Sequence, residues 1–268
     1  MRLPDYHVHS YFSADSNARH LETAQAAKKR GITDLCFTDH MDLGHSDEGF
    51  NRIPDFEGMQ LAAKDAQEKV PEMHIRCGLE AGYLPQTAEK TAEVISKQKL
   101  DYVILSTHVV NGVDCVYPEI ASQNDQMELY RDYLKAVYDS VTDPHIQDFY
   151  DCVGHLGYVA KWGHYVDNTF SYDLFPSLID EILLAVIESG KGIEVNTSGL
   201  DRAGHVLPHR SIIQRYFDLG GTVITVGSDA HVSRGVGEGI ESTVGLLQEV
   251  GFSKITVFKE HTASFVPL

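Results

Sequence analysis

Short apolar runs alternate with longer amphipathic stretches along almost the whole chain. The apolar runs are rich in Val, Ile, Leu, Cys and Phe, which is typical of strands buried on both faces of a parallel sheet. They cover Tyr6–His9, Ile32–His40, Met73–Tyr83, Asp101–Val110, Asp151–Val159, Gly192–Thr197 and Thr222–His231. We therefore expect strands at these seven positions, with a further short apolar run at Ile255–Phe258.

The stretches between the apolar runs have the character of helices. Several are followed by a glycine or a proline, residues that favour a helix end: Gly31, Pro71, Gly190, Gly220 and Gly251. The predicted helices are His20–Arg30, Asp55–Val70, Gln86–Gln98, Gln123–Val141, Leu174–Ser189, Pro208–Leu219 and Glu238–Val250.

Strands that alternate with helices indicate βαβ units and a parallel sheet. Seven repeats in one chain favour a closed or nearly closed α/β barrel, a distorted (β/α)7 relative of the TIM barrel. The competing architecture is a doubly wound open sheet, which usually has a glycine-rich first turn. The first turn here, HSYFSADSN, contains no glycine. No linker divides the chain, so we expect a single domain over residues 1–268.

Histidines and acids lie at or near the carboxyl ends of the predicted strands. Side chains alternate along a strand with period two, so His7 and His9 are expected to face the same way, as are Asp229 and His231. In β/α barrels the carboxyl ends of the strands meet in one small volume. The residues concerned are His7, His9, Asp39, His40, Glu80, His108, His155, Asp229 and His231.

A single histidine at a strand end is usually a hydrogen-bonded core residue, but the whole set needs another explanation. Buried carboxylates and imidazoles would repel one another and lose solvation unless a cation neutralised them. Imidazole with carboxylate and without thiolate suits zinc, iron or manganese. We expect two to three such ions, with Glu80, on a central strand, as the bridging acid. Asp39, beside His40, either orients an imidazole or makes a plain strand-end hydrogen bond.

Composition narrows the choice of partners and compartment. The formal net charge is −17, which disfavours nucleic acid and anionic membranes as partners. The four cysteines form no CxxC pair and are expected to be reduced and buried: Cys36, Cys77, Cys115 and Cys152. The chain shows neither a signal peptide nor a membrane span, so a cytoplasmic enzyme is the expectation. The sequence does not define an oligomeric state.

Several motifs resemble those of the polymerase and histidinol phosphatase (PHP) superfamily. They are DYHVHSYFSAD, CFTDH, GLEAGY, STH, VGHLGYVAKWG, EVNTSGLDR and GSDAH, in the family's order. They look closest to the monofunctional histidinol-phosphate phosphatases. The resemblance implies a distorted seven-stranded barrel with a trinuclear metal site. It implies a first metal at His7, His9, Glu80 and Asp229, a second at Glu80, His108 and His155, and a third at Asp15, His40 and His231. Asp15 stands where several members have a histidine.

The resemblance also implies the reaction, hydrolysis of L-histidinol phosphate to L-histidinol and phosphate by a metal-bridging hydroxide. Glu80, Asp229 and His231 are expected at the reacting centre, and either Asp229 or a metal-bound water would protonate the leaving group. Candidate substrate contacts are Lys161, which replaces a family arginine, Arg202, Arg234 and His45. We expect His45 to lie in a loop, 41–52, that either covers the substrate or is simply solvated. His20, His209 and Arg210 are expected to be surface or capping residues.

Three other functions stay open from the residues alone. One is a phosphoesterase that acts on another small phosphate ester or a nucleotide. Another is an amidohydrolase-like enzyme, although no lysine stands at an apolar strand end, where such enzymes usually place a bridging lysine. The last is a metal-dependent binding domain without turnover.

Overall fold

Seven parallel strands form the central sheet of the protein. The computed structural model describes residues 2–163 and 165–268, and within them the strand order is β1-β2-β3-β4-β7-β8-β9. The strands are β1 (Pro4–Val8), β2 (Asp34–Met41), β3 (His74–Gly82), β4 (Tyr102–Ser106), β7 (Cys152–Val153), β8 (Gly192–Asn196) and β9 (Ile224–Gly227). Each lies within or overlaps one of the predicted apolar runs.

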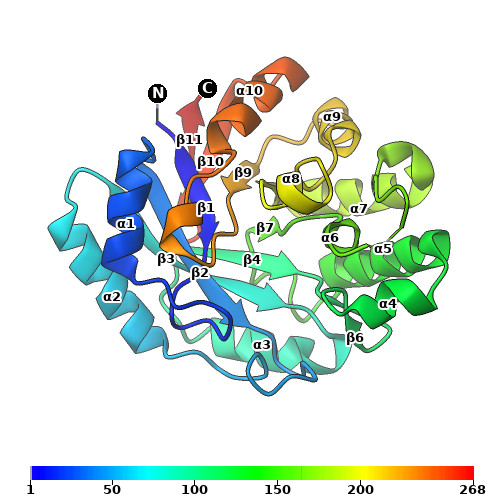
Figure 1. Ribbon diagram of the computed structural model, residues 1–268, viewed down its shortest axis with the longest axis horizontal. Coiled ribbons are helices and arrows are strands. Elements are labelled where there is room, and N and C mark those ends of the chain that lie inside the picture. The colour runs from blue at the N-terminus through cyan, green and yellow to red at the C-terminus, as the bar shows by residue number, and fades with distance from the viewer. Residues whose placement is uncertain (1, 164) are drawn as a thin grey trace.

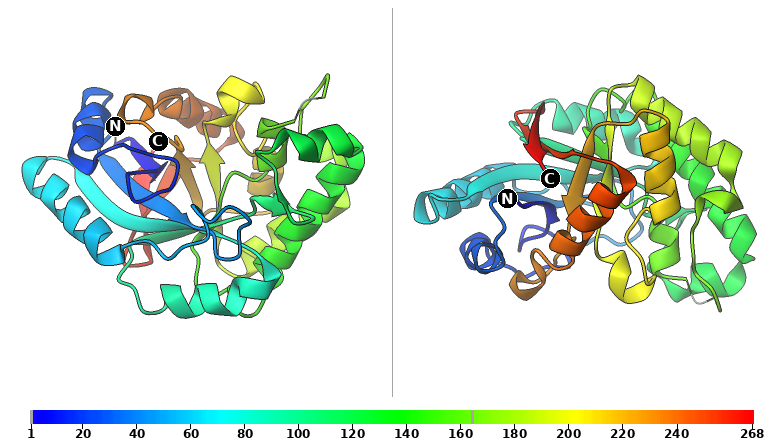
Figure 2. Two further views of the ribbon diagram at one scale, coloured as in Figure 1. Left: turned by 60° about the horizontal axis from the view of Figure 1, so that its bottom comes forward. Right: turned by 90° about the horizontal axis from the view of Figure 1, so that it is seen from above.

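The sheet curls until its first and last strands meet. Val8 pairs with Ala230 in an isolated parallel bridge, and the backbone N–H of His9 donates to the carbonyl of Ala230 at 3.0 Å. Helices surround the sheet on its outer side (Figures 1 and 2). The result is the nearly closed, TIM-like barrel that the alternation of elements predicted, and the open doubly wound sheet is excluded.

The helices largely follow the predicted stretches. The longer ones are α1 (His20–Lys29), α2 (Phe56–Lys69), α3 (Ala88–Ile95), α4 (Pro118–Gln123), α5 (Gln126–Thr142), α7 (Pro176–Glu188), α9 (Arg210–Asp218) and α10 (Ile240–Val250). Short turns of helix are η1 (Pro85–Thr87), α6 (Tyr158–Lys161), η2 (Tyr172–Leu174), α8 (Gly199–Arg202) and η3 (Ser233–Gly235). In the described ranges, none of these helices combines the length and apolarity needed to cross a membrane.

Local chemistry moves two boundaries in the middle of the chain. The helix predicted over Gln123–Val141 begins only at Gln126, as α5. The Asp125 carboxylate caps it there by accepting from the N–H groups of Met127 and Glu128. The fourth strand ends at Ser106 rather than Val110. The chain then forms a small antiparallel hairpin of β5 (Val109–Val110) and β6 (Val113–Asp114).

The fifth and seventh strands are shorter than predicted because non-glycine residues interrupt them in the left-handed region. His155 has φ 20° and Asp229 has φ 56°. The strand predicted through Val159 is therefore wrong, since the chain leaves the sheet after Val153 and turns into α6. Asp229 and His231 likewise follow β9 instead of ending it.

The interior has two parts. The larger core packs between the sheet and the helices. The smaller one fills the barrel at the amino ends of the strands, where Tyr6, Tyr102 and Cys152 pack against Phe258. Phe258 belongs to a C-terminal hairpin of β10 (Lys254–Lys259) and β11 (Thr262–Pro267), which lies beside β1 and β9 (Figure 1). All four cysteines are buried and free, as predicted.

Candidate metal centre

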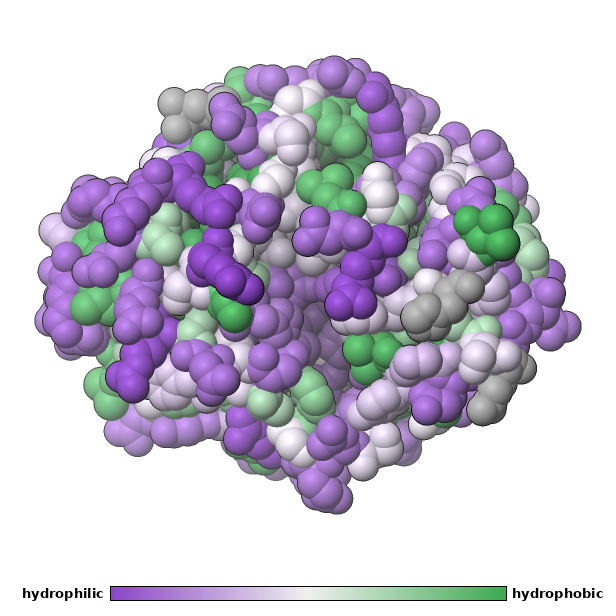
Figure 3. Space-filling view, viewed as in Figure 1, coloured by the Kyte–Doolittle hydropathy of each residue, from purple (hydrophilic) through white to green (hydrophobic). Residues whose placement is uncertain are grey.

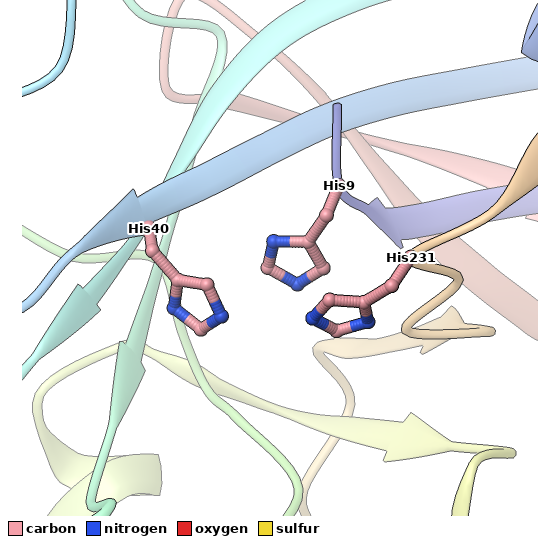
Figure 4. Close-up of side chains that lie close together, drawn as sticks. All are labelled: His9, His40 and His231. Atoms are coloured by element: carbon pink, nitrogen blue, oxygen red, sulfur yellow. The ribbon is translucent and has the colours of Figure 1, made fainter. Parts of the chain in front are cut away.

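The predicted donor residues come together at the carboxyl end of the barrel. Each of the seven strands of the sheet except β8 is followed by, or contains, one or more of them. Figure 4 shows three, His9, His40 and His231, whose rings turn toward one another from β1, β2 and the segment after β9. Most of the donors are buried, whereas the Asp15 and His231 side chains are 35% and 29% exposed.

Glu80 lies at the middle of the cluster. Its Oε1 is 2.7 Å from His155 Nε2 and 3.1 Å from His108 Nε2. Its Oε2 is 3.2 Å from both His7 Nε2 and His40 Nδ1. His9 Nε2 is 3.4 Å from the same Oε2. One carboxylate thus faces five imidazoles, with its two oxygens directed to different sets, which is the arrangement that a bridging ligand needs.

A second group lies closer to solvent. The His9 ring packs against those of His40 and His231, with centroids 4.3 and 4.1 Å away, and the His40 and His231 centroids are 5.9 Å apart. Asp15 Oδ2 is 2.9 Å from His231 Nε2 and 3.8 Å from His40 Nε2. Asp15, from the first loop, therefore reaches the two histidines with which the family pattern associates it.

Asp229 completes the deep side of the cluster. Its Oδ1 is 3.3 Å from His9 Nε2 and 3.7 Å from His7 Nε2. Its backbone N–H donates to the carbonyl of His7 at 2.7 Å, which holds the left-handed conformation in place. A non-glycine residue held with positive φ stores strain that the surrounding structure must offset, and such residues gather at functional sites.

The clusters able to hold one ion overlap but do not reproduce the expected partition. Four sets of donor atoms lie within 4.8 Å of one another: His9, His40 and His231; His7, His155 and Asp229; His7, His9 and Glu80; and His40, Glu80 and His108. His155 thus groups with His7 and Asp229 instead of with His108. Asp15 belongs to none of the four.

Two buried acids that the sequence did not point to hold the imidazoles from behind. Asp42 Oδ1 is 2.6 Å from His108 Nδ1, and Glu194 Oε1 is 2.7 Å from His7 Nδ1. Glu194 Oε2 also accepts from the backbone N–H of His155 at 2.8 Å. Such acceptors fix the tautomer and orientation of a metal-binding imidazole. Glu194 had a signal, since it is an acid within the apolar run Gly192–Thr197.

Glycines make room for these acids. A Cβ on Gly82 would collide with the Asp42 carboxylate, and one on Gly227 would collide with His7 and Glu194.

Asp39 contacts an imidazole indirectly, through a serine. It accepts from Ser13 Oγ at 2.8 Å, and Ser13 Oγ lies 3.1 Å from His9 Nδ1. The structure thus combines the two roles considered for Asp39, because its hydrogen bond to Ser13 supports the His9 ring.

The donor set fits divalent cations on a test that the structure itself supplies. Buried polar atoms at the centre have no hydrogen-bond partner within the described part of the chain: Glu80 Oε2, His40 Nδ1, Asp42 Oδ2 and His155 Nδ1. Leaving a buried polar atom unpaired costs about 1–3 kcal/mol. Glu80 Oε2 and His40 Nδ1 lie 3.2 Å apart at the middle of the cluster, where a cation would satisfy both.

The electrostatics of the cluster favour added positive charge. Burial lowers the pKa of His7, but Glu194, Glu80 and Asp229 outweigh burial and raise it well above its usual value. Burial likewise opposes a rise for His40, whose pKa reaches about 9 beside Glu80 and Asp42. Burial, with repulsion from His231 and His40, lowers the pKa of His9 to about 3. Cations and protons therefore compete for these sites.

The donors form the base of a cavity of about 610 Å³ that opens to solvent. Figure 3 shows a hollow near the middle of this face with largely hydrophilic walls. One wall carries Lys161 and Arg202, with the Arg202 guanidinium 4.1 Å from the centre of the Trp162 ring. Asp114, Tyr117 and Phe50 form another group of lining residues, since Tyr117 N–H donates to Asp114 O at 3.1 Å and the Phe50 ring lies 5.2 Å from that of His45, which contacts Asp114. The cavity therefore has a cationic part and an acidic, aromatic part.

Two predicted substrate contacts do not face this cavity. His45 is buried, and its Nε2 lies 2.9 Å from Asp114 Oδ2, so it supports a wall residue from behind. Arg234 is exposed in η3 and is not among the lining residues. Neither side chain lines the cavity, because the loop 41–52 folds inward at His45 and Arg234 is exposed in η3.

Three other basic residues can be placed as well. His20 is buried against Phe37, with ring centroids 3.9 Å apart, so its prediction as a surface or capping residue is wrong in burial. His209 caps α9 by accepting from the N–H of Ser211, as predicted. Arg210 is exposed and pairs with Glu249.

A β/α barrel with buried imidazoles and carboxylates at its mouth, open to a cavity with cationic and acidic walls, defines a metal-binding barrel enzyme. Within that class the chain belongs to the PHP domain family, whose model matches residues 5–198. The strand β9 and the residues Asp229 and His231 follow this matched segment.

Known proteins similar to this chain agree with that membership. The histidinol-phosphatase of Lactococcus lactis is 30% identical over 264 residues, which cover 96% of this chain and 95% of that enzyme. The crystal structure of histidinol phosphate phosphatase from L. lactis, complexed with zinc, L-histidinol and phosphate, superposes with a TM-score of 0.88 at 26% identity, over 98% of this chain and 99% of that one. A crystal structure from Listeria monocytogenes superposes with a TM-score of 0.75 at 18% identity, over 89% of this chain and 99% of that one, and therefore shares the fold.

Proposed function

We propose that the protein is a metal-dependent histidinol-phosphatase that hydrolyses L-histidinol phosphate to L-histidinol and phosphate. The observation that supports this best is the cavity over the donor cluster, whose lining includes the cations Lys161 and Arg202 and a separate group of Asp114, Phe50 and Tyr117. Its polarity matches a substrate with a phosphate at one end and a cationic amino-imidazole at the other. The similarity to the L. lactis enzyme over nearly the whole of both chains supports the same reaction.

We assign the donors to two or three divalent cations within one PHP-type barrel domain, residues 1–268. The first would be held by His7, His9, Glu80 and Asp229, the second by Glu80, His108 and His155, and the third by Asp15, His40 and His231. The mixed donor set suits zinc, iron or manganese. When bound, these ions activate water near neutral pH and offset the charge of the phosphoryl oxygens.

Lys161 and Arg202 hold the phosphoryl group in this proposal. Lys161 Nζ donates to Ser198 Oγ at 2.9 Å and to Asp229 Oδ2 at 3.0 Å, so its ammonium is fixed at the edge of the donor cluster. The Trp162 ring lies near both cations, 5.3 Å from Lys161 Nζ. This wall presents two positive charges to a phosphate dianion that rests on the donor cluster.

Asp114 accepts the cationic end of the substrate. Its Oδ1 accepts from the backbone N–H of Val116 at 2.8 Å and its Oδ2 from His45, so the carboxylate has a fixed orientation in the wall. Phe50 and Tyr117 line the same part of the cavity and offer faces for an imidazole ring. The protein thus selects for charge at both ends of the molecule.

The leaving alkoxide must gain a proton, and Asp229 is a poor source. Burial raises the pKa of Asp229, but Lys161, His7 and His9 outweigh burial and hold it well below its usual value. A carboxyl group with that proton affinity stays ionised. We therefore assign proton donation to a water molecule, and to Asp229 the roles of orienting Lys161 and holding a cation.

The test is phosphate release from L-histidinol phosphate by the purified protein, with metals counted by mass spectrometry in the same sample. We expect kcat/KM of at least about 10⁴ M⁻¹s⁻¹ and two or three metals per chain. Nucleotides, sugar phosphates and other amino-alcohol phosphates, run in parallel, should be hydrolysed at least about 100-fold less efficiently.

Other results would move the assignment in defined directions. Faster hydrolysis of another ester would keep the phosphatase chemistry and change the substrate. Bound metal without any phosphate release would indicate a binding domain, and activity on amides or lactones would indicate an amidohydrolase-like enzyme.

Asp114→Asn should raise KM for L-histidinol phosphate by about tenfold or more, while Asp47→Asn, in the exposed part of the 41–52 loop, should leave KM unchanged.

A further inference from the structure

A second large cavity lies away from the metal centre, near the amino ends of the strands. Its volume is about 680 Å³, similar to that of the active-site cavity. Its walls come from α2, the start of β3, the segment between α3 and β4, and the turn between β10 and β11. None of its lining residues belongs to the donor cluster or to the walls of the active-site cavity.

Cations collect around this cavity although the protein carries a formal net charge of −17. Lys64, Arg76 and Lys99 all line it, and within residues 2–163 and 165–268 none of the three has an ion-pair partner. Other lysines of the same segments do pair: Lys69 with Asp65 and Lys97 with Glu93. Three cations without an ion-pair partner among the described residues thus line one cavity.

Arg76 gives the cavity a fixed charge at its inner side. It lies on the same face of β3 as Glu80, four residues earlier, and therefore at the opposite end of the barrel interior. Its Nε is buried and has no hydrogen-bond partner among the described residues. One of its terminal nitrogens donates to the carbonyl of Ile75 at 3.4 Å, and an anion in the cavity would pair with the part of the guanidinium that lines it.

The two acids that line the cavity, Asp101 and Glu260, offset two of its three positive charges and leave one in excess. Both oxygens of Asp101 are engaged by the backbone, since Oδ2 accepts from Cys77 N–H at 3.0 Å and Oδ1 from Glu260 N–H at 3.1 Å. Glu260 is exposed in the turn of the hairpin. Next to it, His261 pairs with Asp151 at 2.9 Å, and this pairing raises the pKa of His261.

We propose that this cavity binds a small phosphate-class oxyanion, either free phosphate or the phosphoryl end of a metabolite, at a site separate from the metal centre. Arg76 contacts the anion from the inner wall, and Lys64 and Lys99 contact it from α2 and from the segment before β4. Two flexible lysines beside one anchored arginine form a clamp of the kind that recognises phosphate groups.

The experiment counts inorganic phosphate bound to the metal-loaded full-length protein by equilibrium dialysis with radiolabelled phosphate. The variant Lys64→Ala/Lys99→Ala should bind one phosphate fewer per chain than the unmodified protein. The matched control, Lys69→Ala/Lys97→Ala, removes the same charge from the same two segments and should lose none. Arg76→Gln, with folding checked by its Tm, should weaken the same phosphate at least about tenfold.

The variant Lys161→Ala/Arg202→Ala distinguishes phosphate bound at the active site from phosphate bound in this cavity. It should still bind the phosphate that Lys64→Ala/Lys99→Ala loses. Displacement of that phosphate by methylphosphonate would assign the site to the phosphoryl end of a metabolite, and lack of displacement to inorganic phosphate. An unchanged phosphate count in Lys64→Ala/Lys99→Ala would overturn the proposal, whatever substrate the metal centre hydrolyses.

Discussion

The two ends of the barrel interior are made by the same strands and are filled in opposite ways. At the carboxyl ends, Glu80 and its surrounding imidazoles are largely buried, and several of their polar atoms make no hydrogen bond to another described residue. At the amino ends, Tyr6 and Tyr102 pack with the C-terminal hairpin, and their hydroxyl groups have partners: Phe258 O and Thr225 Oγ1, both at 3.0 Å. The polar carboxyl end is suited to function, and the aromatic packing at the amino end to stability.

This contrast predicts that substitutions at the two ends will have different consequences. At the metal centre they should reduce activity and metal content with smaller changes in folding. At the packed end they should reduce the free energy of unfolding and leave the chemistry of correctly folded molecules intact. The predictions below test that separation, beginning with the largest effect.

Glu80→Ala should abolish metal binding and activity together. The Glu80 carboxylate, the proposed bridge, faces His7, His40, His108 and His155, so its removal would disrupt more than one of the proposed ion sites. We expect kcat/KM to fall by at least about 1,000-fold and the metal content to fall toward zero by mass spectrometry. Glu68→Ala, on the exposed side of α2, is the control. Retention of the full metal content in Glu80→Ala would contradict the ligand assignment.

Phe258→Ala should act on stability alone. The Phe258 ring is buried and stacks on Tyr102 with centroids 5.1 Å apart. Truncation leaves a cavity in the packed end and should cost about 3–5 kcal/mol of unfolding free energy. Chemical denaturation measures this loss, and kcat/KM per folded molecule should stay within about twofold. A large change in kcat/KM would show that the two ends are coupled.

Asp42→Asn should produce an intermediate effect on the metal centre. Its carboxylate orients His108 and lies 3.2 Å from His40 Nδ1. Loss of such a supporting acid typically lowers metal affinity or activity by about 10–100-fold. Competition with a chelator measures the affinity, and Asp47→Asn, an exposed acid five residues later, should behave like the unmodified protein. Gly82→Ala, which pushes on the Asp42 carboxylate, should reproduce part of the loss.

The smallest effect concerns the pH dependence of stability at the packed end. The hydrogen bond to Asp151 raises the pKa of His261 above the ordinary value of 6.5. A raised folded-state pKa contributes stability that is complete below pH 6.5 and is lost as the pH rises through the higher folded-state value. Because His261 is 43% exposed, we expect less than about 1 kcal/mol.

The measurement is the denaturation midpoint between pH 5.5 and 8.5 in phosphate-free buffer. His261→Gln should lose that part of the pH dependence, whereas His145→Gln, an exposed histidine beside Asp143, is the comparison on another surface. An equal slope in His261→Gln and the unmodified protein would show that the pair contributes nothing measurable.

Hydrophobic alternation was sufficient to predict the barrel, because buried parallel strands and amphipathic helices leave a strong periodic pattern. It failed where single residues override the pattern. The left-handed conformations at His155 and Asp229 are set by contacts with strands far away in sequence, such as the bond from Asp229 N–H to His7 O. The secondary-structure propensities of neighbouring residues do not indicate contacts between residues so far apart in the sequence.

The candidate donors could be predicted because their chemistry is visible in the residue types, while their supports were missed. Asp42 was interpreted as part of a solvated or substrate-covering loop, and only the fold shows that it is buried behind His108. That Arg234 and His45 do not line the cavity was missed for the same reason, since the direction of a loop side chain depends on tertiary packing. Glu194 could have been found as a charged residue in a fully buried strand.

The joining of β1 to the segment after β9 has a consequence for the order of events during synthesis. His7 meets Asp229, and Tyr6 meets Phe258, across separations of 222 and 252 residues. On a growing chain the first strand leaves the ribosome long before either partner exists. One side of β1 therefore stays unmatched until the last part of the barrel has been made. The metal centre can consequently assemble only late, after Asp229 and His231 have been synthesised, and it cannot initiate folding of the barrel.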